Sequence, residues 1–180
     1  MRCVALLRGI NVGGRKSLKM ADLKRVFESL SFKNVQTYVQ SGNVIFDCKP
    51  AETAKIAEGV EARLLEVFGV SPALIIRTQN DLKRIIDNNP LVRKANTEPD
   101  KLHVTFLLDA PDETIVSKLD VTPGPGEMFA LAGKEVYLYC PNGYARTRLN
   151  NAAFEAGLKT LATTRNWKTV NKLLSFSTFS

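Results

Sequence analysis

Apolar residues recur along this chain in a pattern that predicts the same order of strands and helices twice. Residues 2–8 form an almost wholly apolar strand, and a helix over 17–30, capped by Ser17, carries apolar residues three and four apart. The first half continues with strands over 35–40 and 44–48, a helix opened by Pro50, a strand over 73–77, and a short helix carrying Leu82, Ile85 and Ile86.

The second half repeats this order. Its expected elements are strands over 102–108, 128–131, 135–140 and 161–164, and helices over 111–119, capped by Asp109, over 150–158, capped by Asn150, and over 166–174. The order βαββαβ is that of the ferredoxin-like plan. The sequence therefore predicts an α+β protein with two tandem ferredoxin-like subdomains, each followed by an extra helix.

The polar, proline-containing stretches set the expected domain boundaries. The subdomains are expected over 1–90 and 101–176, joined by a linker over 91–100. The residues from Ser175 onward are expected to fray, with 177–180 outside the second subdomain.

Composition narrows the class of protein. The chain has 180 residues, 44% of them hydrophobic, and no apolar run approaches the roughly 20 residues of a membrane span. Its start lacks a secretory signal, which predicts a cytoplasmic protein without a membrane partner. The three cysteines, Cys3, Cys48 and Cys140, are expected as buried free thiols, and the single histidine, His103, excludes a His-rich metal site. No metal or cofactor is expected.

The strongest candidate site is the segment that follows the first strand. Three glycines and three cations without an acid lie between Arg8 and Lys16, a composition suited to binding an anion, although the spacing fits neither common nucleotide-binding glycine motif. In the predicted topology the turn at 40–43 lies at the same end of the sheet. The candidate binding residues are Arg8, Asn11, Gly13, Gly14, Arg15, Lys16, Gln40, Ser41 and Asn43. In the alternative interpretation, the glycines only permit turns and the asparagines hold them.

A secondary anion site is expected near the start of the last helix. Its residues are Thr164, Arg165, Asn166 and Lys168, whose hydroxyl, amide and cationic groups suit a phosphate or carboxylate. The alternative is ordinary helix capping by Thr164 or Asn166. Tyr144, Arg146 and Arg148 form a third basic and aromatic patch.

The pattern disfavours several functional classes. The first strand has no aromatic residue and the third has only Phe46, which disfavours an RNA-stacking sheet. Hydrolase, metalloprotease and redox motifs are absent, so no catalytic residue is assigned and an enzymatic role stays open. The segment between Arg8 and Lys16 favours an anionic small molecule as the ligand. Nucleic acid, bound through the basic surface of this chain with its net charge of +7, and a protein partner are the alternatives. Monomer and homodimer both stay open.

Four segments carry a resemblance to a known family. They are ALLRGINVGG at 5–14, MADLKRVFESL at 20–30, TYVQSGNVIF at 37–46 and TTRNWKTVNKLL at 163–174. With these segments the chain resembles the bacterial proteins grouped as domain of unknown function 1697. The resemblance covers essentially the whole chain and implies a small cytoplasmic α+β protein with two ferredoxin-like subdomains. It implies no reaction, cofactor or catalytic residue.

Overall fold

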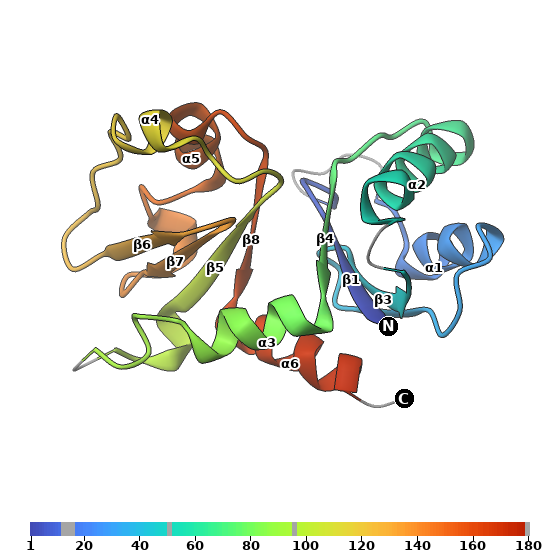
Figure 1. Ribbon diagram of the computed structural model, residues 1–180, viewed down its shortest axis with the longest axis horizontal. Helices are drawn as coiled ribbons and strands as arrows, with labels where there is room; N and C mark the ends of the chain where they lie inside the picture. The colour runs from blue at the N-terminus through green and yellow to red at the C-terminus, as the bar shows by residue number, and fades with distance from the viewer. Residues whose placement is uncertain (12–16, 50–51, 95–96, 179–180) are drawn as a thin grey trace. The chain divides into compact units, whose positions relative to one another are not determined.

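The computed structural model describes residues 1–11, 17–49, 52–94 and 97–178. Contacts divide the chain into two compact units, which are described separately below (Figure 1). Unit 1 comprises Met1–Lys83 with Leu173–Ser180, and unit 2 comprises Arg84–Lys172. The chain passes from one unit to the other within helix α3 (Gln79–Asp87) and again within helix α6 (Trp167–Thr178). Each unit contains one four-stranded antiparallel sheet, so the protein belongs to the α+β class.

Unit 1 is built on a sheet with the strand order β2-β3-β1-β4. Its elements are β1 (Arg2–Leu7), α1 (Met20–Ser29), β2 (Gln36–Tyr38), β3 (Asn43–Asp47), α2 (Thr53–Phe68) and β4 (Leu74–Thr78). Strand β1 pairs with both β3 and β4, and all six of its residues are buried. This central position explains why β1 is apolar on both faces, as the sequence predicted.

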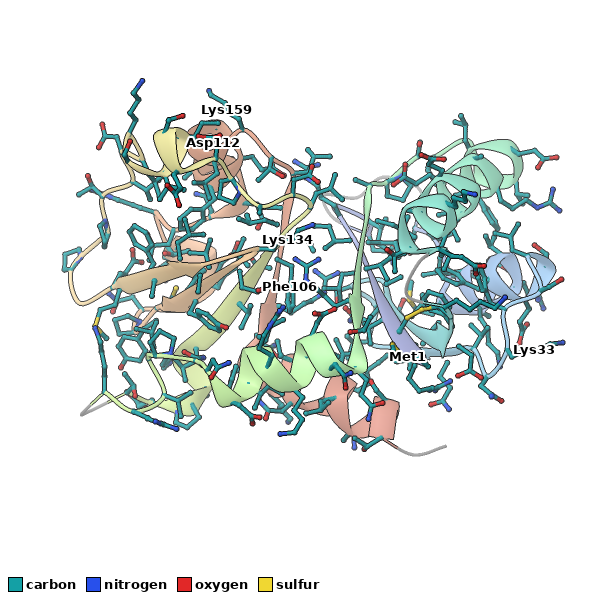
Figure 2. The ribbon with its side chains drawn as sticks, viewed as in Figure 1. Met1, Lys33, Phe106, Asp112, Lys134 and Lys159 are labelled. Carbon is teal, nitrogen blue, oxygen red and sulfur yellow. A yellow bond between two sulfur atoms is a disulfide. The ribbon has the colours of Figure 1, made fainter. Side chains whose placement is uncertain are left out.

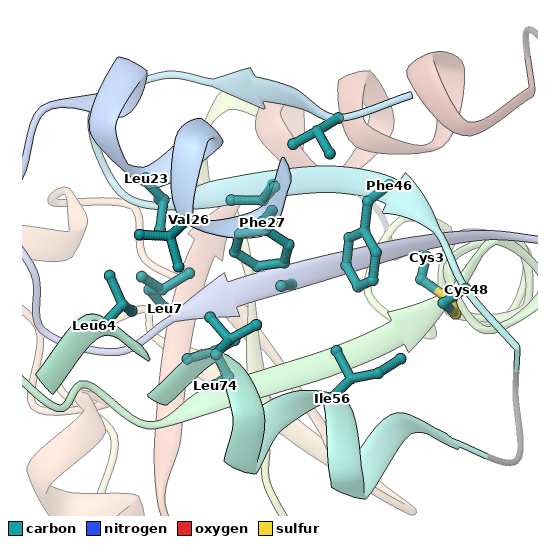
Figure 3. Close-up of a cluster of buried hydrophobic side chains, with 14 of the residues drawn as sticks. Cys3, Leu7, Leu23, Val26, Phe27, Phe46, Cys48, Ile56, Leu64 and Leu74 are labelled. Carbon is teal, nitrogen blue, oxygen red and sulfur yellow. A yellow bond between two sulfur atoms is a disulfide. The ribbon is translucent and has the colours of Figure 1, made fainter. Parts of the chain in front are cut away.

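Helices α1 and α2 cover one face of this sheet (Figure 1). Phe27 of α1 and Phe46 of β3 lie at the centre of the core, with ring centroids 5.0 Å apart (Figure 3). Leu64 of α2 joins the same core and is fully buried. Helix α2 ends at Gly69, whose φ of 68° is the left-handed conformation common after a helix.

Unit 2 has the corresponding strand order, β6-β7-β5-β8. Its elements are the 3₁₀ turn η2 (Pro99–Lys101), β5 (Leu102–Leu107), α4 (Glu113–Val116), β6 (Met128–Ala132), β7 (Glu135–Tyr139), the 3₁₀ turn η3 (Tyr144–Arg146), α5 (Asn151–Leu158) and β8 (Ala162–Asn166). Phe154 and Leu158 of α5 pack on Leu138 of β7 in a separate core.

A corresponding backbone hydrogen bond occurs inside each of the two units. The amide of Leu7 donates to Gly42 over 2.9 Å in unit 1, and the amide of Leu107 donates to Lys134 over 2.8 Å in unit 2. Both bonds join the end of the central strand to the turn beside it. The repeat seen in the sequence pattern is therefore present at the level of single backbone contacts.

A partly buried contact between a side chain and the backbone repeats as well. The Glu61 carboxylate of α2 accepts the amide of Leu74 at the start of β4, over 2.8 Å. The Glu155 carboxylate of α5 accepts the amide of Ala162 at the start of β8, also over 2.8 Å. In each unit one helix thus satisfies the first amide of the last strand, an edge group that the sheet leaves unpaired.

Helices α1 and α4 begin later than the sequence predicted, and the predicted opening of α2 at Pro50 lies outside the described residues. Helix α1 begins at Met20 after Lys19, because the hydroxyl of the expected cap Ser17 instead donates to Asn11 over 3.3 Å. Helix α4 is capped by Asp112 rather than Asp109, since the Asp112 carboxylate accepts the amide of Thr114 over 2.8 Å. The predicted cap Asn150 of α5 is confirmed by its bond from the amide of Ala153, at 3.0 Å.

The expected fraying from Ser175 onward is wrong for residues 175–178. Helix α6 continues to Thr178, and Ser177 within it is fully buried. Phe176 packs edge-on against Tyr38 of β2, with ring centroids 5.4 Å apart. The end of this helix is therefore tied down by an apolar contact, and chain ends fray only where such contacts are missing.

The expectation of three free thiols is also wrong. Cys3 and Cys48 form a disulfide inside the core of unit 1 (Figure 3), and only Cys140 is free. Cys3 lies on β1 and Cys48 directly follows β3, so the pairing of these two strands brings the sulfur atoms together. The cysteines consequently no longer support a reducing compartment. No helix in the described part of the chain has both the length and the apolar character to cross a bilayer.

Candidate functional site

The end of β1 meets the turn between β2 and β3, as the predicted topology required. The amide of Leu7 donates to Gly42, and the side chain of Ile10 packs directly on that glycine. A Cβ at Gly42 would lie 2.5 Å from Ile10 Cδ1, and its φ of 77° is itself a conformation that other residues rarely adopt. Gly42 is therefore required for this close approach.

Asn11 joins the segment after β1 to two other parts of unit 1. Its amide nitrogen donates to Gln40 O over 2.9 Å and to Leu18 O over 3.0 Å. Its amide oxygen accepts from Leu18 N over 2.7 Å, so Asn11 is bound both to the segment before α1 and to the turn after β2. Asn11 has a left-handed φ of 56°, which asparagine tolerates better than most residues. We call the surface formed by residues 8–11 and 39–42 the β1 rim.

The turn that completes the β1 rim has a strained backbone. Val39 has a φ of 51°, a rare conformation for a β-branched residue, and its side chain is 46% exposed. The side chain of Asn43 is fully buried and donates to Tyr38 O over 2.9 Å and to Ser41 Oγ over 3.0 Å. Asn43 therefore holds the turn in shape from below.

The structure brings together only part of the predicted site. Arg8 and Asn11 are half-buried beside the turn, whereas Gln40 and Ser41 are exposed on it. Four predicted residues lie outside the described residues, namely Gly13, Gly14, Arg15 and Lys16. The alternative interpretation of the asparagines matches the contacts observed, since both amides bind backbone groups of the loop itself.

The residues of the predicted secondary site lie on strand β8 and at the start of α6. Thr164 Oγ1 donates a hydrogen bond to Asn151 Oδ1 over 2.7 Å and accepts one from the Tyr144 hydroxyl over 3.0 Å. It also lies 2.7 Å from Thr105 Oγ1. A hydroxyl with one donation and two acceptances has no capacity left. Thr164 therefore serves a closed hydrogen-bond network within unit 2.

Arg165, Asn166 and Lys168 lie outside this hydroxyl network. Successive strand residues point to opposite faces, which separates Arg165 from Thr164. Arg165 is buried and donates to Thr163 Oγ1 over 2.8 Å, and burial lowers its pKa to about 10, while the neighbouring Tyr144 acts in the opposite direction. Asn166 caps α6 by accepting the amide of Thr169 over 2.7 Å, and Lys168 is exposed.

Sequence analysis missed a stacked pair beside this network. His103 lies against Tyr144, with ring centroids 5.1 Å apart and planes at 26°. Burial lowers the pKa of His103, and its contact with the carbonyl of Lys101 acts in the opposite direction. Burial also raises the pKa of Tyr144. His103 and Tyr144 are 41 residues apart along the chain, so no local sequence pattern predicts that their rings stack.

The aromatic residues of the central strands do not offer an exposed stacking surface. Phe46 packs among the helix-facing residues of unit 1. In unit 2, Phe106, Tyr137 and Tyr139 lie on β5 and β7, which the sequence analysis did not weigh, and all three are buried. Burial raises the pKa of Tyr137 to about 12, with a further contribution from the nearby Glu135 carboxylate. Within the described ranges, no three His, Cys, Asp or Glu side chains are grouped as metal ligands would be.

Comparison with known proteins places the chain in a family. A model of a protein family of unknown function, DUF1697, matches residues 1–137. The chain belongs to the DUF1697 family. This DUF1697 chain is also similar to a solved structure, the conserved bacterial protein SP0830 from Streptococcus pneumoniae, at 21% identity and a TM-score of 0.75 over 98% of each chain. That similarity shows a shared fold. No curated protein matches the DUF1697 chain.

Proposed function

We propose that the protein binds a phosphorylated or other anionic small molecule at the β1 rim. Arg8 supplies charge from within the rim, and the exposed Gln40 and Ser41 supply polar groups that orient the ligand. In this proposal Arg15 and Lys16 add charge, and Gly13 and Gly14 add backbone donors.

The observation that carries the proposal is the bridge made by Asn11. Its contacts with Leu18 and Gln40 hold both flanks of the glycine- and cation-rich stretch, residues 11 and 17–18, beside the turn. The left-handed backbone of Val39 adds to this support, because strained conformations cluster at functional sites. Asn11 and Asn43 act here as positioning residues.

We also infer that each unit is a ferredoxin-like subdomain, with the cytoplasmic setting that the family resemblance implies. The strand orders β2-β3-β1-β4 and β6-β7-β5-β8 support this inference, as does the repeated contact of Glu61 and Glu155 with the last strand. In this fold the first and second strands run parallel, so both finish at the same end of the sheet. The β1 rim would then be a feature of the topology, available for elaboration by the loop after β1.

A thermal-shift screen tests the binding proposal. Phosphorylated metabolites, nucleotides and short oligonucleotides are added at low and at high salt to the wild type, to Arg8→Ala and to an Arg15→Gln/Lys16→Gln double variant. A ligand at 100 times its Kd stabilises the folded state by about 2.7 kcal/mol. We expect a small anion to raise the Tm of the wild type in both salts and to leave the Tm of both variants unchanged.

The matched control is Lys33→Gln. Lys33 O accepts the amide of Asp47, which pairs with Arg2 at the start of β1, so Lys33 lies at the opposite end of the sheet from the β1 rim (Figure 2). This control should respond like the wild type. Equal responses from all variants would refute the β1 rim as the site, and shifts from oligonucleotides alone, lost at high salt, would favour nucleic-acid binding instead.

A further inference from the structure

A cavity in unit 2 is formed by elements that the β1 rim does not use. It has a volume of about 710 Å³ and lies between α4, the segment over 117–122 and α5. Volumes of roughly 300–1,000 Å³ are typical of sites for small molecules. Figure 2 shows Lys159, a lining residue, and Asp112, the cap of α4, at the end of unit 2 where α4 and α5 lie.

The floor of the cavity consists of residues with small, apolar side chains or none. Ala153, Ala156 and Gly157 line it from α5, and their spacing of three and four places them on one face of that helix. Ile115 of α4 and Val121 line the opposite wall. A floor without long side chains leaves open the space that an apolar ligand group can occupy.

The absence of a side chain at Gly157 gives Leu119 room to pack on α5. A Cβ at Gly157 would lie 2.5 Å from Leu119 Cδ1, closer than packed atoms approach. The segment over 117–122 therefore lies directly against the helix at this point.

Cationic residues from three different segments surround the opening. Lys118 follows α4, Arg148 precedes α5, and Lys159 is the C-cap of α5, whereas Asp120 is the one acidic residue that lines the cavity. All three cations are exposed, and none of them forms an ion pair or a side-chain hydrogen bond with a residue that the structure describes. The positive charge around the opening is thus available to a ligand.

We propose that this cavity binds a small organic anion with an apolar body, a carboxylate or phosphate ester carried on a short hydrocarbon or aromatic group. The apolar floor favours removal of such a body from water, and the cations pair with its charged end. An inorganic anion would leave the floor unused, and a neutral apolar molecule would leave the cations unused. Every lining residue belongs to unit 2, so this site is separate from the β1 rim in unit 1.

The test titrates the ¹⁵N-labelled full-length protein with 1-naphthyl phosphate and follows amide chemical shifts by NMR. Inorganic phosphate and 1-naphthol, each of which has half of the required chemistry, serve as comparison probes. We expect saturable shifts centred on residues 114–122 and 148–159, and binding about tenfold weaker for either comparison probe. Equal binding of phosphate or of 1-naphthol would overturn the proposed ligand class.

Two pairs of variants then locate the site. Arg148→Gln removes one cation from the opening, and its control is Arg146→Gln, an exposed arginine that does not line the cavity. Ala156→Leu fills the floor, and its control is Ala152→Leu, an exposed alanine of the same helix outside the lining. We expect each lining variant to weaken 1-naphthyl phosphate binding about tenfold and each control to change it less than about twofold. A lining variant that behaves like its control, with an intact NMR spectrum, would refute the site.

Discussion

At the residue scale, short polar side chains decide the shape of the β1 rim. Sequence analysis left open whether its asparagines contact a ligand or hold the turn. The deciding partner of Asn11 is Gln40 O, 29 residues away along the chain, and that of Asn43 is Tyr38 O. The sequence showed that these residues meet at one end of the sheet, because that follows from strand direction. It did not show the individual bonds, because a side-chain amide can bind any backbone group within reach, and the tertiary structure determines which groups those are.

His103 gives the molecule an acid-sensitive contribution to stability. Burial lowers its pKa below the usual value of about 6.5, so the unfolded chain binds more protons than the folded protein as the pH falls through 6.5. The contribution is complete above pH 6.5 and is lost below it, towards the lower pKa of the folded state. We expect the free energy of unfolding to fall more steeply between pH 7.5 and 5.5 in the wild type than in His103→Gln.

The chain contains a single histidine, so its ring protons report this titration directly by NMR. The midpoint in the folded protein should lie below that in the urea-unfolded chain. A folded-state midpoint at or above the unfolded one would contradict the prediction.

At the scale of the elements, hydrophobic periodicity predicted the order of strands and helices well, since burial on one face is a local property of the sequence. The boundaries moved where a side chain has a tertiary partner. Ser17 does not cap α1 because its hydroxyl donates to Asn11, and α6 extends past Ser175 because Phe176 packs against Tyr38 of β2. Such competition between capping and other contacts depends on tertiary neighbours, which periodicity does not report.

The contact between α5 and β8 predicts a cost for losing one carboxylate. Glu155→Ala would leave the amide of Ala162 without this acceptor, and an unpaired buried donor costs about 1–3 kcal/mol. Urea unfolding should show this loss of stability, whereas Glu155→Gln should recover part of it because the Gln side chain keeps an acceptor oxygen. Glu58→Ala, at an exposed position of α2, is the control and should change stability by less than about 0.5 kcal/mol. A loss no larger than that of the control would show that the contact contributes nothing.

At the scale of the whole molecule, each unit has its own sheet and its own core, and only unit 1 has a disulfide. The predicted topology contained the signal for this bond, because it made β1 and β3 neighbours. Cys3 pairs across from Phe46, which puts Cys48 within reach. The expectation of free thiols instead followed the general tendency of cysteine to be buried, and a compositional rule of that kind says nothing about where two side chains meet.

Reduction should therefore weaken unit 1 selectively. The bond closes a loop of 45 residues, and the chain-entropy relation assigns such a loop about 4 kcal/mol of stabilisation. We expect hydrogen exchange of β1 and β3 amides to accelerate when reductant is added, with β5 and β7 unaffected. Thiol labelling of the unfolded, unreduced chain should modify Cys140 alone.

The control is a Cys3→Ala/Cys48→Ala double variant, whose exchange should not respond to reductant. Acceleration in both units alike, or in the double variant, would show that reductant acts through something other than this bond. Burial raises the pKa of the Cys140 thiol and lowers its reactivity in the folded protein. Cys140 should therefore not contribute to the response of either protein to reductant.

The equivalence of the two units gives Cys3 and His103 a common position. Cys3 lies on the central strand of unit 1 opposite Thr78, and His103 lies on the central strand of unit 2 opposite Asn166. Each of these partners directly follows an arginine of the last strand, Arg77 in unit 1 and Arg165 in unit 2. At this position unit 1 carries a disulfide-bonded sulfur, which a reductant can release, and unit 2 carries a protonatable ring. The two halves of the protein thus differ in what their stability is expected to depend on, so that reduction would loosen unit 1 and acidification would loosen unit 2.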